Sequence, residues 1–213
     1  MTDRISFQGE PGANSHIAAN AAYPELEAMA CPTFEDAFAA VKDGQARYAM
    51  IPIENSVAGR VADVHHLIPE SDLYVVAERF VPIRHQLLGI KGATLAGLKA
   101  VRSHPQALGQ CRKVLRTMGV EAVKTADTAG AAREIFELGD PSIGALASSL
   151  AAEIYGLDIL NADVADAAHN TTRFLVFSKT PEDAEPEDGP CMTSFVFRVR
   201  NVPAALYKAL GGF

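Results

Sequence analysis

Short apolar runs alternate along this chain with segments in which apolar residues recur every three or four positions. A run of four to eight apolar or β-branched residues is typical of a buried strand, whereas the wider spacing is typical of an amphipathic helix. The runs that predict strands lie at 5–7, 48–53, 73–77, 87–90, 98–101, 143–147 and 173–178. This alternation predicts an α/β fold.

The predicted helices begin at polar residues that can accept a backbone N–H, which a helix N-terminus leaves unpaired. These helix starts lie at Asn14 or Ser15, at Thr33, at Ser103 and at Asp127 or Thr128. Thr33 with Asp36, and Ser103 with Gln106, have the spacing of a capping box. The helix that begins at Ser103 should continue to Met118, and Gly139 and Gly156 are typical of helix ends.

The pattern breaks between Pro181 and Pro190, a stretch with five acidic residues, three prolines and no apolar face. Such a composition predicts a linker. Beyond it, 194–199 alternates like a strand and 203–210 resembles the start of a helix. Fewer than ~40 residues rarely form a core of their own, so 191–213 are expected to begin a further domain. Alternatively, they form a strand and a helix that pack on the main body.

Composition and charge exclude several classes of protein. The chain has 213 residues, of which 48% are hydrophobic, and it lacks the run of ~18 apolar residues that a membrane span needs. No secretory signal follows Met1, so a cytoplasmic location is expected. The formal net charge of −7 argues against a nucleic-acid partner. It also means that an anionic ligand must be captured by local positive groups.

The cysteines and histidines lack the spacing of metal ligands. Cys31, Cys111 and Cys191 are far apart and odd in number, so each is expected to be a small buried hydrophobic residue rather than part of a disulfide framework. His65 and His66 are adjacent and therefore point in different directions, and no His-x-x-x-His pair occurs. Without a phosphate loop or a dinucleotide fingerprint either, the sequence predicts no metal and no cofactor.

Two polar segments follow predicted strands. Gly9 and Gly12 allow a tight turn, and the exposed N–H groups of such a turn can bind a carboxylate, although most glycine-rich turns are only turns. Glu54, Asn55 and Ser56 directly follow a buried strand, where open α/β sheets collect their ligands. They could equally form a capped turn with solvated side chains.

Three further segments carry polar residues beside apolar strands. Gln86 adjoins the run 87–90, and a buried amide needs partners from a ligand or from the backbone. Ser103-His104-Pro105-Gln106 by itself is a well-formed helix start. The strongest signal is Asn170-Thr171-Thr172-Arg173-Phe174, because an arginine fork suits a carboxylate and a neighbouring hydroxyl can donate to a departing oxygen. A polar entrance to a strand is the alternative.

Together and in this order, these segments resemble the signatures of prephenate dehydratases. The matching segments are the glycine-rich turn ending in Ser15, Glu54-Asn55-Ser56-x-x-Gly59-x-Val61, His85-Gln86-Leu87-Leu88-Gly89, Ser103-His104-Pro105-Gln106-Ala107-Leu108 and Thr172-Arg173-Phe174. The resemblance covers about residues 5–179, and 193–197 and 202–206 resemble the opening of an ACT regulatory domain. The departures from the family pattern are Ala13-Asn14 in place of Thr-Phe, Arg60 in place of a small residue, and Ala204 in place of Gly.

The resemblance implies an α/β catalytic domain over 1–180, with two lobes like those of a type II periplasmic binding protein and a central cleft. Lobe one would comprise about 1–80 and 170–180, and lobe two about 81–169. An acidic, proline-rich linker (181–190) and the N-terminal fragment of an α+β ACT domain (191–213) would follow. The reaction implied is the conversion of prephenate to phenylpyruvate, carbon dioxide and water in phenylalanine biosynthesis, without a cofactor.

The resemblance also assigns roles to residues. Thr172 would donate a hydrogen bond or a proton to the leaving hydroxyl, and Arg173 would stabilise a substrate carboxylate or orient the hydrogen-bond network around Thr172. Glu54 would orient donors or pair with an arginine, because an ionised carboxylate repels a dianion, and Phe174 would pack. The expected substrate-binding residues are Gly12, Ser15, Glu54, Asn55, Ser56, Gln86, Ser103, Thr171 and Phe174.

Regulation and assembly are implied by the same resemblance. The protein would be a homodimer or homotetramer that phenylalanine inhibits through the ACT domain, with Val202, Pro203, Ala204 and Leu206 as the remnant of the effector site. A chain with an incomplete ACT domain is expected to be active but poorly inhibited.

Other readings differ in what they leave unexplained. A two-lobed binding protein without catalysis would not account for Thr172-Arg173-Phe174. A purely regulatory phenylalanine sensor would need a complete ACT domain. Arogenate, which has an amino group where prephenate has a keto oxygen, could be a second substrate.

Overall fold

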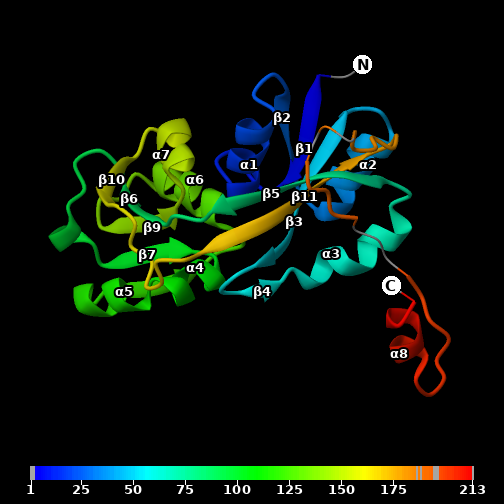
Figure 1. Ribbon diagram of the computed structural model, residues 1–213. Coiled ribbons are helices and arrows are strands. Elements are labelled where there is room, and N and C mark those ends of the chain that lie inside the picture. Colours follow the sequence, from blue (N-terminus) through cyan, green and yellow to red (C-terminus); the bar gives the residue numbers. More distant parts are fainter. Residues whose placement is uncertain (1–2, 186, 188, 194–196, 213) are drawn as a thin grey trace. The chain divides into compact units, whose positions relative to one another are not determined.

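The computed structural model describes residues 3–185, 187, 189–193 and 197–212. The chain divides into two compact units, residues 1–182 and 183–213. The first unit holds two separate β-sheets, each with helices packed against it (Figure 1). The part around the first sheet is called lobe one below, and the part around the second sheet is called lobe two.

The sheet of lobe one has the strand order β2-β1-β3-β11-β5, and a short β4 pairs with β3. β1 is parallel to β2 and β3, whereas β11 is antiparallel to β3 and β5. The strands are β1 (Arg4–Gln8), β2 (Glu27–Cys31), β3 (Tyr48–Asn55), β4 (Gly59–Arg60), β5 (Tyr74–Pro82) and β11 (Thr171–Ser178). The helices are α1 (Asn14–Ala22), α2 (Phe34–Lys42), α3 (Ala62–Leu67) and the 3-10 helix η1 (Ile68–Glu70).

Strand β11 serves both faces of this sheet, because successive side chains of a strand point to opposite sides. Phe174 and Val176 pack in the core beneath α1, whereas Leu175 and Phe177 pack in the core beneath α2 and α3. Full burial of one such side chain stabilises the fold by about 1.5–3 kcal/mol. β11, which comes from late in the chain, therefore packs against the helices on both faces of the lobe one sheet.

The sheet of lobe two has the strand order β10-β6-β9-β7-β8. Its strands are β6 (Gln86–Gly89), β7 (Ala100–Ser103), β8 (Glu121–Lys124), β9 (Ile143–Ala147) and β10 (Asp158–Asn161). Its helices are the 3-10 helix η2 (Leu95–Gly97), α4 (Pro105–Gln110), α5 (Arg112–Met118), α6 (Thr128–Leu138) and α7 (Ser149–Tyr155). Within the described ranges, no helix is long and apolar enough to cross a membrane.

The chain crosses between the lobes twice, once between β5 and β6 and once between β10 and β11. The two crossings are hydrogen-bonded to each other. The Ile83 N–H donates to the Asn170 carbonyl at 2.7 Å, and the Val164 N–H donates to the His85 carbonyl at 2.9 Å. Two sheets joined by paired crossings confirm the predicted two-lobed α/β fold.

Each strand predicted up to residue 178 is present within a few residues of its expected position. The caps predicted at Thr33 and Asp127 are also confirmed, and the Thr33 capping box is complete. The expectation for the first helix was wrong: α1 has Ala13 at its N-cap, and no side chain caps it. Asn14 and Ser15 already lie within the helix.

The helix predicted from Ser103 to Met118 also differs from expectation. Ser103 lies at the end of β7, where its hydroxyl donates to the Leu146 carbonyl at 2.6 Å and so ties β7 to β9. His104 caps α4 instead, because its Nδ1 accepts the Gln106 N–H. The helical conformation is interrupted at Cys111, so two helices, α4 and α5, occupy this stretch.

Two of the three cysteines are buried as predicted, Cys31 and Cys111, but Cys191 is exposed. Cys191 lies in the second unit, which has helix α8 (Ala205–Leu210) in place of the predicted 203–210. Of the predicted strand 194–199, residues 194–196 lie outside the described residues and 197–199 are irregular. Ala204 has a φ of 62°, the left-handed region that favours glycine, where the sequence resemblance expected Gly.

Candidate active site

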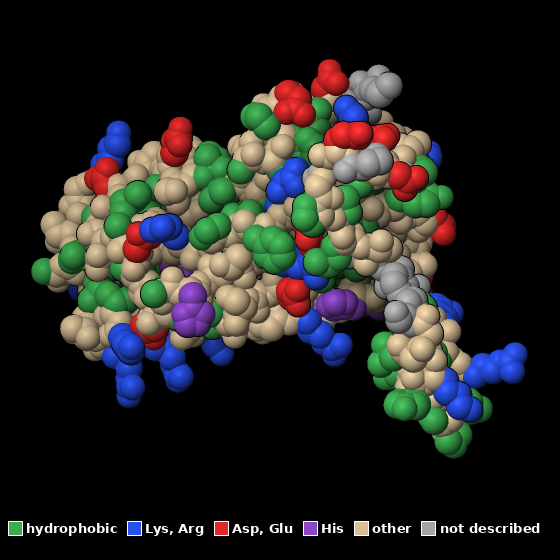
Figure 2. Space-filling view, in the orientation of Figure 1, with side chains coloured by type: hydrophobic (Ala, Val, Ile, Leu, Met, Phe, Trp, Pro, Cys, Tyr) green, Lys and Arg blue, Asp and Glu red, His purple; other side chains and the backbone are tan. Residues whose placement is uncertain are grey.

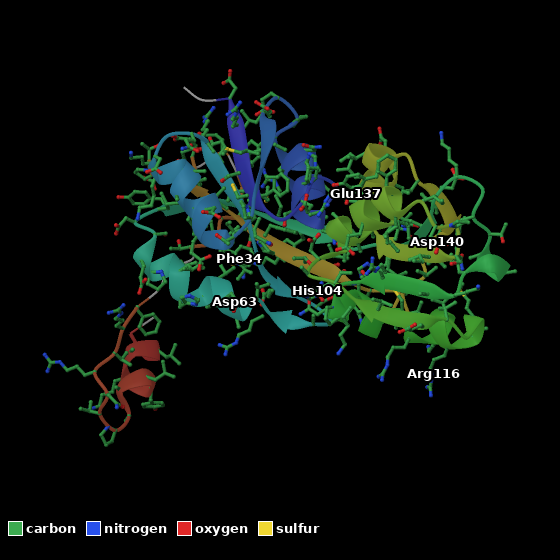
Figure 3. The ribbon with its side chains drawn as sticks, turned by 180° about the vertical axis from the view of Figure 1, so that it is seen from behind. Phe34, Asp63, His104, Arg116, Glu137 and Asp140 are labelled. Atoms are coloured by element: carbon green, nitrogen blue, oxygen red, sulfur yellow. The ribbon has the colours of Figure 1, made fainter. Side chains whose placement is uncertain are left out.

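A cavity of about 570 Å³ lies between the lobes and is lined by both. Lobe one contributes residues after β1 and β3, the start of α1 and two side chains of β11, and lobe two contributes the starts of α4 and α6. Figure 3 labels three lining residues, Phe34 and Asp63 from lobe one and His104 from lobe two. The other polar lining residues include Asn14, Ser15, Asn55, His85, Gln106, Gln110, Thr128 and Thr172.

The side chain of Asn55 is held in one orientation by the backbone. Its Oδ1 accepts the N–H groups of Val57 and Ala58 at 2.9 and 2.8 Å. Because backbone amides are donors only, the oxygen must face them. The Nδ2 group therefore points the other way, where it donates to Thr172 Oγ1 at 2.9 Å and to Asn170 Oδ1 at 2.7 Å.

This contact also orients the Thr172 hydroxyl. Thr172 is buried and lines the cavity, and its Oγ1 accepts a hydrogen from Asn55. A hydroxyl that accepts one hydrogen bond still carries its own O–H hydrogen. Among the described residues, no acceptor takes that hydrogen, so the Thr172 O–H can donate to a molecule in the cleft.

The hydrogen bonds continue from Asn55 into lobe two. Asn170 is buried, and its Nδ2 donates to Gln110 Oε1 at 2.9 Å. Gln110 Oε1 also lies 2.7 Å from His85 Nε2. Since this oxygen can only accept, His85 carries its hydrogen on Nε2. A single network thus joins the start of β11, where Thr172 lies, to both crossings and to α4.

Burial lowers the pKa of His85, and the hydrogen bond to Gln110 opposes this shift in part. A lowered pKa keeps the imidazole neutral near pH 7, which is consistent with its single donor role toward Gln110. Because Gln110 Oε1 is occupied twice, its Nε2 is left as a pair of donors. These donors make no hydrogen bond to the described protein atoms, and Gln110 lines the cavity.

Helix N-termini bring a positive electrostatic potential to this cavity. The first residues of α1, α4 and α6 all line it, and each helix N-terminus carries a partial positive charge. The caps of α4 and α6 are occupied by His104 and Asp127. α1 has no side-chain cap and no acidic residue in its first turn, so its free N–H groups are the ones suited to an anion.

The structure separates the sequence-predicted site residues into two groups. Ser15, Asn55, Thr172 and Phe174 line the cavity. Ser56 and Thr171 lie beside it and fasten the strand ends together: the Thr171 N–H donates to Ser56 Oγ at 3.0 Å, and the Ser56 N–H donates to the Thr171 carbonyl at 2.9 Å. Gly12, Glu54, Gln86, Ser103 and Arg173 do not line the cavity.

Arg173 is on the face of β11 that is opposite to Thr172, because neighbouring residues in a strand alternate. Its Nε and Nη2 atoms contact Glu78 Oε2 at 2.9 and 2.8 Å, and its Nη1 contacts Glu54 Oε1 at 3.3 Å. The guanidinium therefore links β11 to β5 and β3, beneath the strand ends that hold Asn55 and Thr172.

The remaining members of the second group also have protein partners. Gln86 exchanges hydrogen bonds with Asp163, through Nε2 to Oδ1 at 3.1 Å and from the Asp163 N–H to Oε1 at 3.0 Å. The Ser103 hydroxyl is fully buried between β7 and β9. The Gly12 N–H donates to His16 Nδ1, and the Gly12 carbonyl accepts the Ser148 hydroxyl, so neither backbone group is left for a ligand.

Sequence reasoning missed His85, His104, Gln106, Gln110 and Asn170 as site residues. Two of them are immediate neighbours of expected residues, His85 beside Gln86 and His104 beside Ser103. In a strand or at a helix cap, a shift of one position moves the side chain to the other side, so the motifs reach the cavity through the neighbours of the expected residues. No group of three His, Cys, Asp or Glu side chains placed to bind a metal occurs among the described residues.

The family model for prephenate dehydratase matches residues 5–182, which include every residue of the cavity. The chain belongs to the prephenate dehydratase family. The match to this family of carbon–oxygen lyases extends along nearly all of the first compact unit.

Individual relatives cover different shares of their own length. A bifunctional N-acyl-homoserine lactone acylase/prephenate dehydratase of Komagataeibacter europaeus is 48% identical over 98% of this chain and 74% of the relative. A chloroplastic arogenate dehydratase/prephenate dehydratase of Arabidopsis thaliana is 43% identical over 99% of this chain and 53% of the relative. The chain thus spans about half the length of this plant relative.

A solved prephenate dehydratase from Arthrobacter aurescens, in complex with L-Phe, has the same fold. It superposes with a TM-score of 0.78 at 28% identity, over 85% of this chain and 63% of that one. The likeness shows that the two-lobed arrangement is the fold of the prephenate dehydratase family.

Proposed function

We propose that this chain is a prephenate dehydratase. The prephenate dianion would lose carbon dioxide and hydroxide to give the phenylpyruvate anion, and one proton would convert the hydroxide to water. The observation that carries this proposal is the Thr172 hydroxyl, which is buried at the cleft, fixed by Asn55, and left with its own hydrogen to donate. Family membership supports the choice of substrate.

The reaction asks little of the protein beyond positioning, because forming an aromatic ring is strongly downhill. Both carboxylates must be held and the two breaking bonds aligned. We assign one carboxylate to the uncapped N-terminus of α1, beside Asn14 and Ser15. The Gln110 Nε2 donors and His104 face the same cavity. His104 accepts a backbone N–H on Nδ1, so its neutral ring carries the hydrogen on Nε2 as a further donor.

Thr172 is assigned to the leaving hydroxyl. A threonine hydroxyl is too weak an acid to give up its proton alone, so it acts by donating a hydrogen bond as hydroxide departs. The Asn55 amide, which donates to Thr172 Oγ1, would stabilise negative charge that develops on that oxygen. Asn170 and Gln110 fix Asn55 from behind.

The sequence-predicted residues outside the cavity take supporting roles in this proposal. Arg173 and Glu54 hold the ends of β11 and β3 from the opposite face. Ser56 and Thr171 close the same strand ends, and Gln86 and Ser103 brace lobe two. Phe174 forms part of the apolar floor beneath the ligand.

The test is the appearance of phenylpyruvate from prephenate with the wild-type chain, Thr172→Val and Thr172→Ser. Valine keeps the shape but removes the hydroxyl, so kcat should fall about 10²–10⁴-fold with a smaller change in KM. Serine keeps the hydroxyl and should retain most of the turnover. A valine variant with wild-type kcat would remove Thr172 from the mechanism, and a folded wild-type chain without turnover would argue against the function.

Arogenate is a second substrate to compare, because the plant relative is named for both acids. The two acids differ only at the keto or amino group, so both fit the same two-carboxylate arrangement. We propose prephenate as the preferred substrate. The ratio of kcat/KM for the two acids measures this preference directly.

Hydrolysis of N-acyl-homoserine lactones is a second candidate function, because the Komagataeibacter relative is 48% identical and is named as such an acylase. Water would cleave the amide to give a carboxylate and a free homoserine lactone. Release of that amine from a medium-chain acyl-homoserine lactone tests this activity. If Thr172→Val loses prephenate turnover but keeps amide hydrolysis, the two reactions use different residues.

We further propose that phenylalanine regulates the protein through residues of the second unit, with only weak inhibition of the 213-residue chain. The solved Arthrobacter relative is a complex with L-Phe, and Val202, Pro203, Ala204 and Leu206 stand in the segment that resembles an ACT domain. Titrating phenylalanine into the turnover assay, with Leu206→Ala as the matched variant, tests this role. An assembly of two or four copies also stays a prediction, which light scattering tests.

A further inference from the structure

A second contact joins the lobes and lies beside the crossing at 83–85, because Ala147, the neighbour of Ser148, pairs with Gln86 in the sheet of lobe two. The loop after β1 in lobe one lies against α6 and α7 of lobe two, and α1 stands beside these two helices in Figure 1. The Ser148 hydroxyl donates to the Gly12 carbonyl at 2.6 Å in a buried position. At the rim of this contact, the Tyr155 hydroxyl donates to the Pro11 carbonyl at 3.1 Å. Arg133 Nη2 lies 3.5 Å from Glu10 Oε1.

Gly12 is the point of closest approach in this contact. A Cβ atom on Gly12 would lie 2.7 Å from Ala151 Cα and 2.8 Å from Ala151 Cβ, and Gly12 has a φ of +92°. Atoms cannot be accommodated at such distances without a shift of the backbone. Any side chain at position 12 would therefore push the loop away from α7, and with it lobe one away from lobe two.

The cavity depends on the distance between the lobes, because its working groups come from both. Asn55 and Thr172 belong to lobe one, whereas His104 and Gln110 belong to lobe two. The same loop continues into the uncapped start of α1, so a shift at Gly12 also moves the proposed carboxylate site. A misplacement of about 1 Å can cost an enzyme about 10²-fold in rate.

We propose that Gly12 and Ser148 are positioning residues: the interlobe contact made by residues 10–12 with Arg133, Ser148, Ala151 and Tyr155 holds the cleft at its working width. This inference rests on the proposed function for its kinetic consequences but not for its structural ones. The contact adds a link between the lobes beyond the chain crossings, so a change at Gly12 or Ser148 alters the spacing between the lobes.

The structural test measures the distance between the lobes. Nitroxide labels at Glu35→Cys in lobe one and Glu153→Cys in lobe two, both exposed, would be introduced in a Cys191→Ser background so that no exposed native thiol is labelled. Double electron–electron resonance should give one narrow distance for the parent. Adding Gly12→Ala should lengthen or broaden that distribution, and an unchanged distribution would overturn the proposal.

The control for Gly12→Ala is Gly44→Ala, because Gly44 has a similar positive φ of +72° but open space around its Cβ position. Both variants bear the backbone strain, but only Gly12→Ala meets the other lobe. We expect Gly12→Ala to lower kcat/KM at least ~10-fold and Gly44→Ala to leave it within about twofold in the folded fraction. Equal activity in the two variants would contradict the role of Gly12.

Ser148 needs a separate comparison, because its hydroxyl also accepts the Ala151 N–H as the cap of α7. Ser148→Ala should lower kcat/KM, and Ser148→Thr should restore it. Tyr155→Phe removes a rim contact and leaves the cap intact, and it should lengthen or broaden the interlobe distance as Gly12→Ala does. Rescue by threonine without any change in distance would assign Ser148 to the cap alone. A wild-type chain without prephenate turnover would refute the proposed function, while the distance measurements would still decide the interlobe contact.

Discussion

Arg173 shows how the partners of one side chain decide its role. Its guanidinium is about one-fifth exposed and contacts Glu78 and Glu54 on the face of β11 away from the cavity. Two carboxylates already neutralise this cation, so it is poorly suited to bind a third from the substrate. We therefore expect Arg173 to matter for the stability of the strand ends more than for contact with prephenate.

Arg173→Lys should lower the free energy of unfolding by roughly 1–3 kcal/mol, because lysine loses the planar fork in a half-buried ion pair. Urea unfolding measures this change. Arg4→Lys is the matched control, since Arg4 Nε contacts Glu27 Oε2 at 2.8 Å with both side chains exposed, and exposed pairs contribute little. If Arg173→Lys abolishes turnover at unchanged stability, a substrate contact has to be reconsidered.

The thiols provide a second prediction for single residues. Burial raises the pKa of Cys111 to about 12, and the charge of Asp166 adds to this shift. Burial likewise raises the pKa of Cys31, whereas Cys191 is exposed. A thiol-specific reagent at pH 8 should therefore react rapidly with one group in the folded chain and with three after unfolding. Cys191→Ser should lose the rapid phase, and rapid reaction of three thiols in the folded chain would contradict the burial.

The sequence motifs lie at the cavity, but they identified only some of the side chains that line it. The order of the motifs indicated a cleft with Asn55 and Thr172, and the structure places both at the cavity. The neighbours Gln86 and His85 could not be told apart, because which one faces the cleft depends on where β6 begins. The partners of Arg173 are distant in sequence and follow only from the pairing of β11 with β3 and β5.

At the scale of elements, α2 shows a helix whose start is encoded locally. The Thr33 hydroxyl accepts the Asp36 N–H, and Asp36 accepts the Thr33 N–H in return. The helix then buries Phe38 and Val41 in the core of lobe one and presents Phe34 to the cavity. Its stability therefore affects both the core and one wall of the cleft.

Thr33→Ala should lower the free energy of unfolding by about 1 kcal/mol, the usual loss when an N-cap is removed. Thr33→Ser keeps the accepting oxygen and should stay within a few tenths of a kcal/mol of the wild type. Urea unfolding of the three proteins measures both differences. Equal stability of the alanine and serine variants would mean that the cap does not limit the stability of α2.

Three strands that the sequence pattern missed share a location in the fold. β2, β8 and β10 are strands at the edges of their sheets, and their exposed or half-exposed side chains include Glu27, Glu121, Lys124 and Asp158. An edge strand carries polar residues that discourage pairing with another chain, so it lacks the apolar run that marked the central strands. The central strands were predictable because they are buried on both faces.

At the scale of the whole molecule, the cleft has a local field that the composition does not suggest. The chain carries a formal charge of −7, and Figure 2 shows acidic and basic side chains distributed over the visible surface. Yet the N-termini of α1, α4 and α6 converge on the cavity from both lobes. Only the folding of two lobes against each other creates this arrangement, so no local sequence pattern could predict it.

Two histidines with lowered pKa values connect the integrity of this arrangement to pH. Burial lowers the pKa of both His16 and His85 from the ordinary value of 6.5. His16 Nδ1 accepts the Gly12 N–H in the interlobe contact, and His85 lies in the network behind Thr172. Each is therefore held neutral in the folded chain at a place where the two lobes meet.

The sign of the effect on stability follows from linkage. Above pH 6.5 both the folded and the unfolded chains hold these histidines neutral, and their contribution is constant. As the pH falls below 6.5, the unfolded chain takes up protons first, so the free energy of unfolding should decrease until the folded pKa values are reached.

Urea unfolding at intervals between pH 8 and pH 5 measures this decrease. His85→Gln and His16→Gln remove one titrating group each, so each variant should show a shallower decrease than the wild type over the same range. The lowered pKa values of Asp140 and Asp163 act in the same direction only below about 3.8, and so they do not interfere. A wild-type stability that is flat from pH 7 to pH 5 would show that neither histidine is held neutral by the fold.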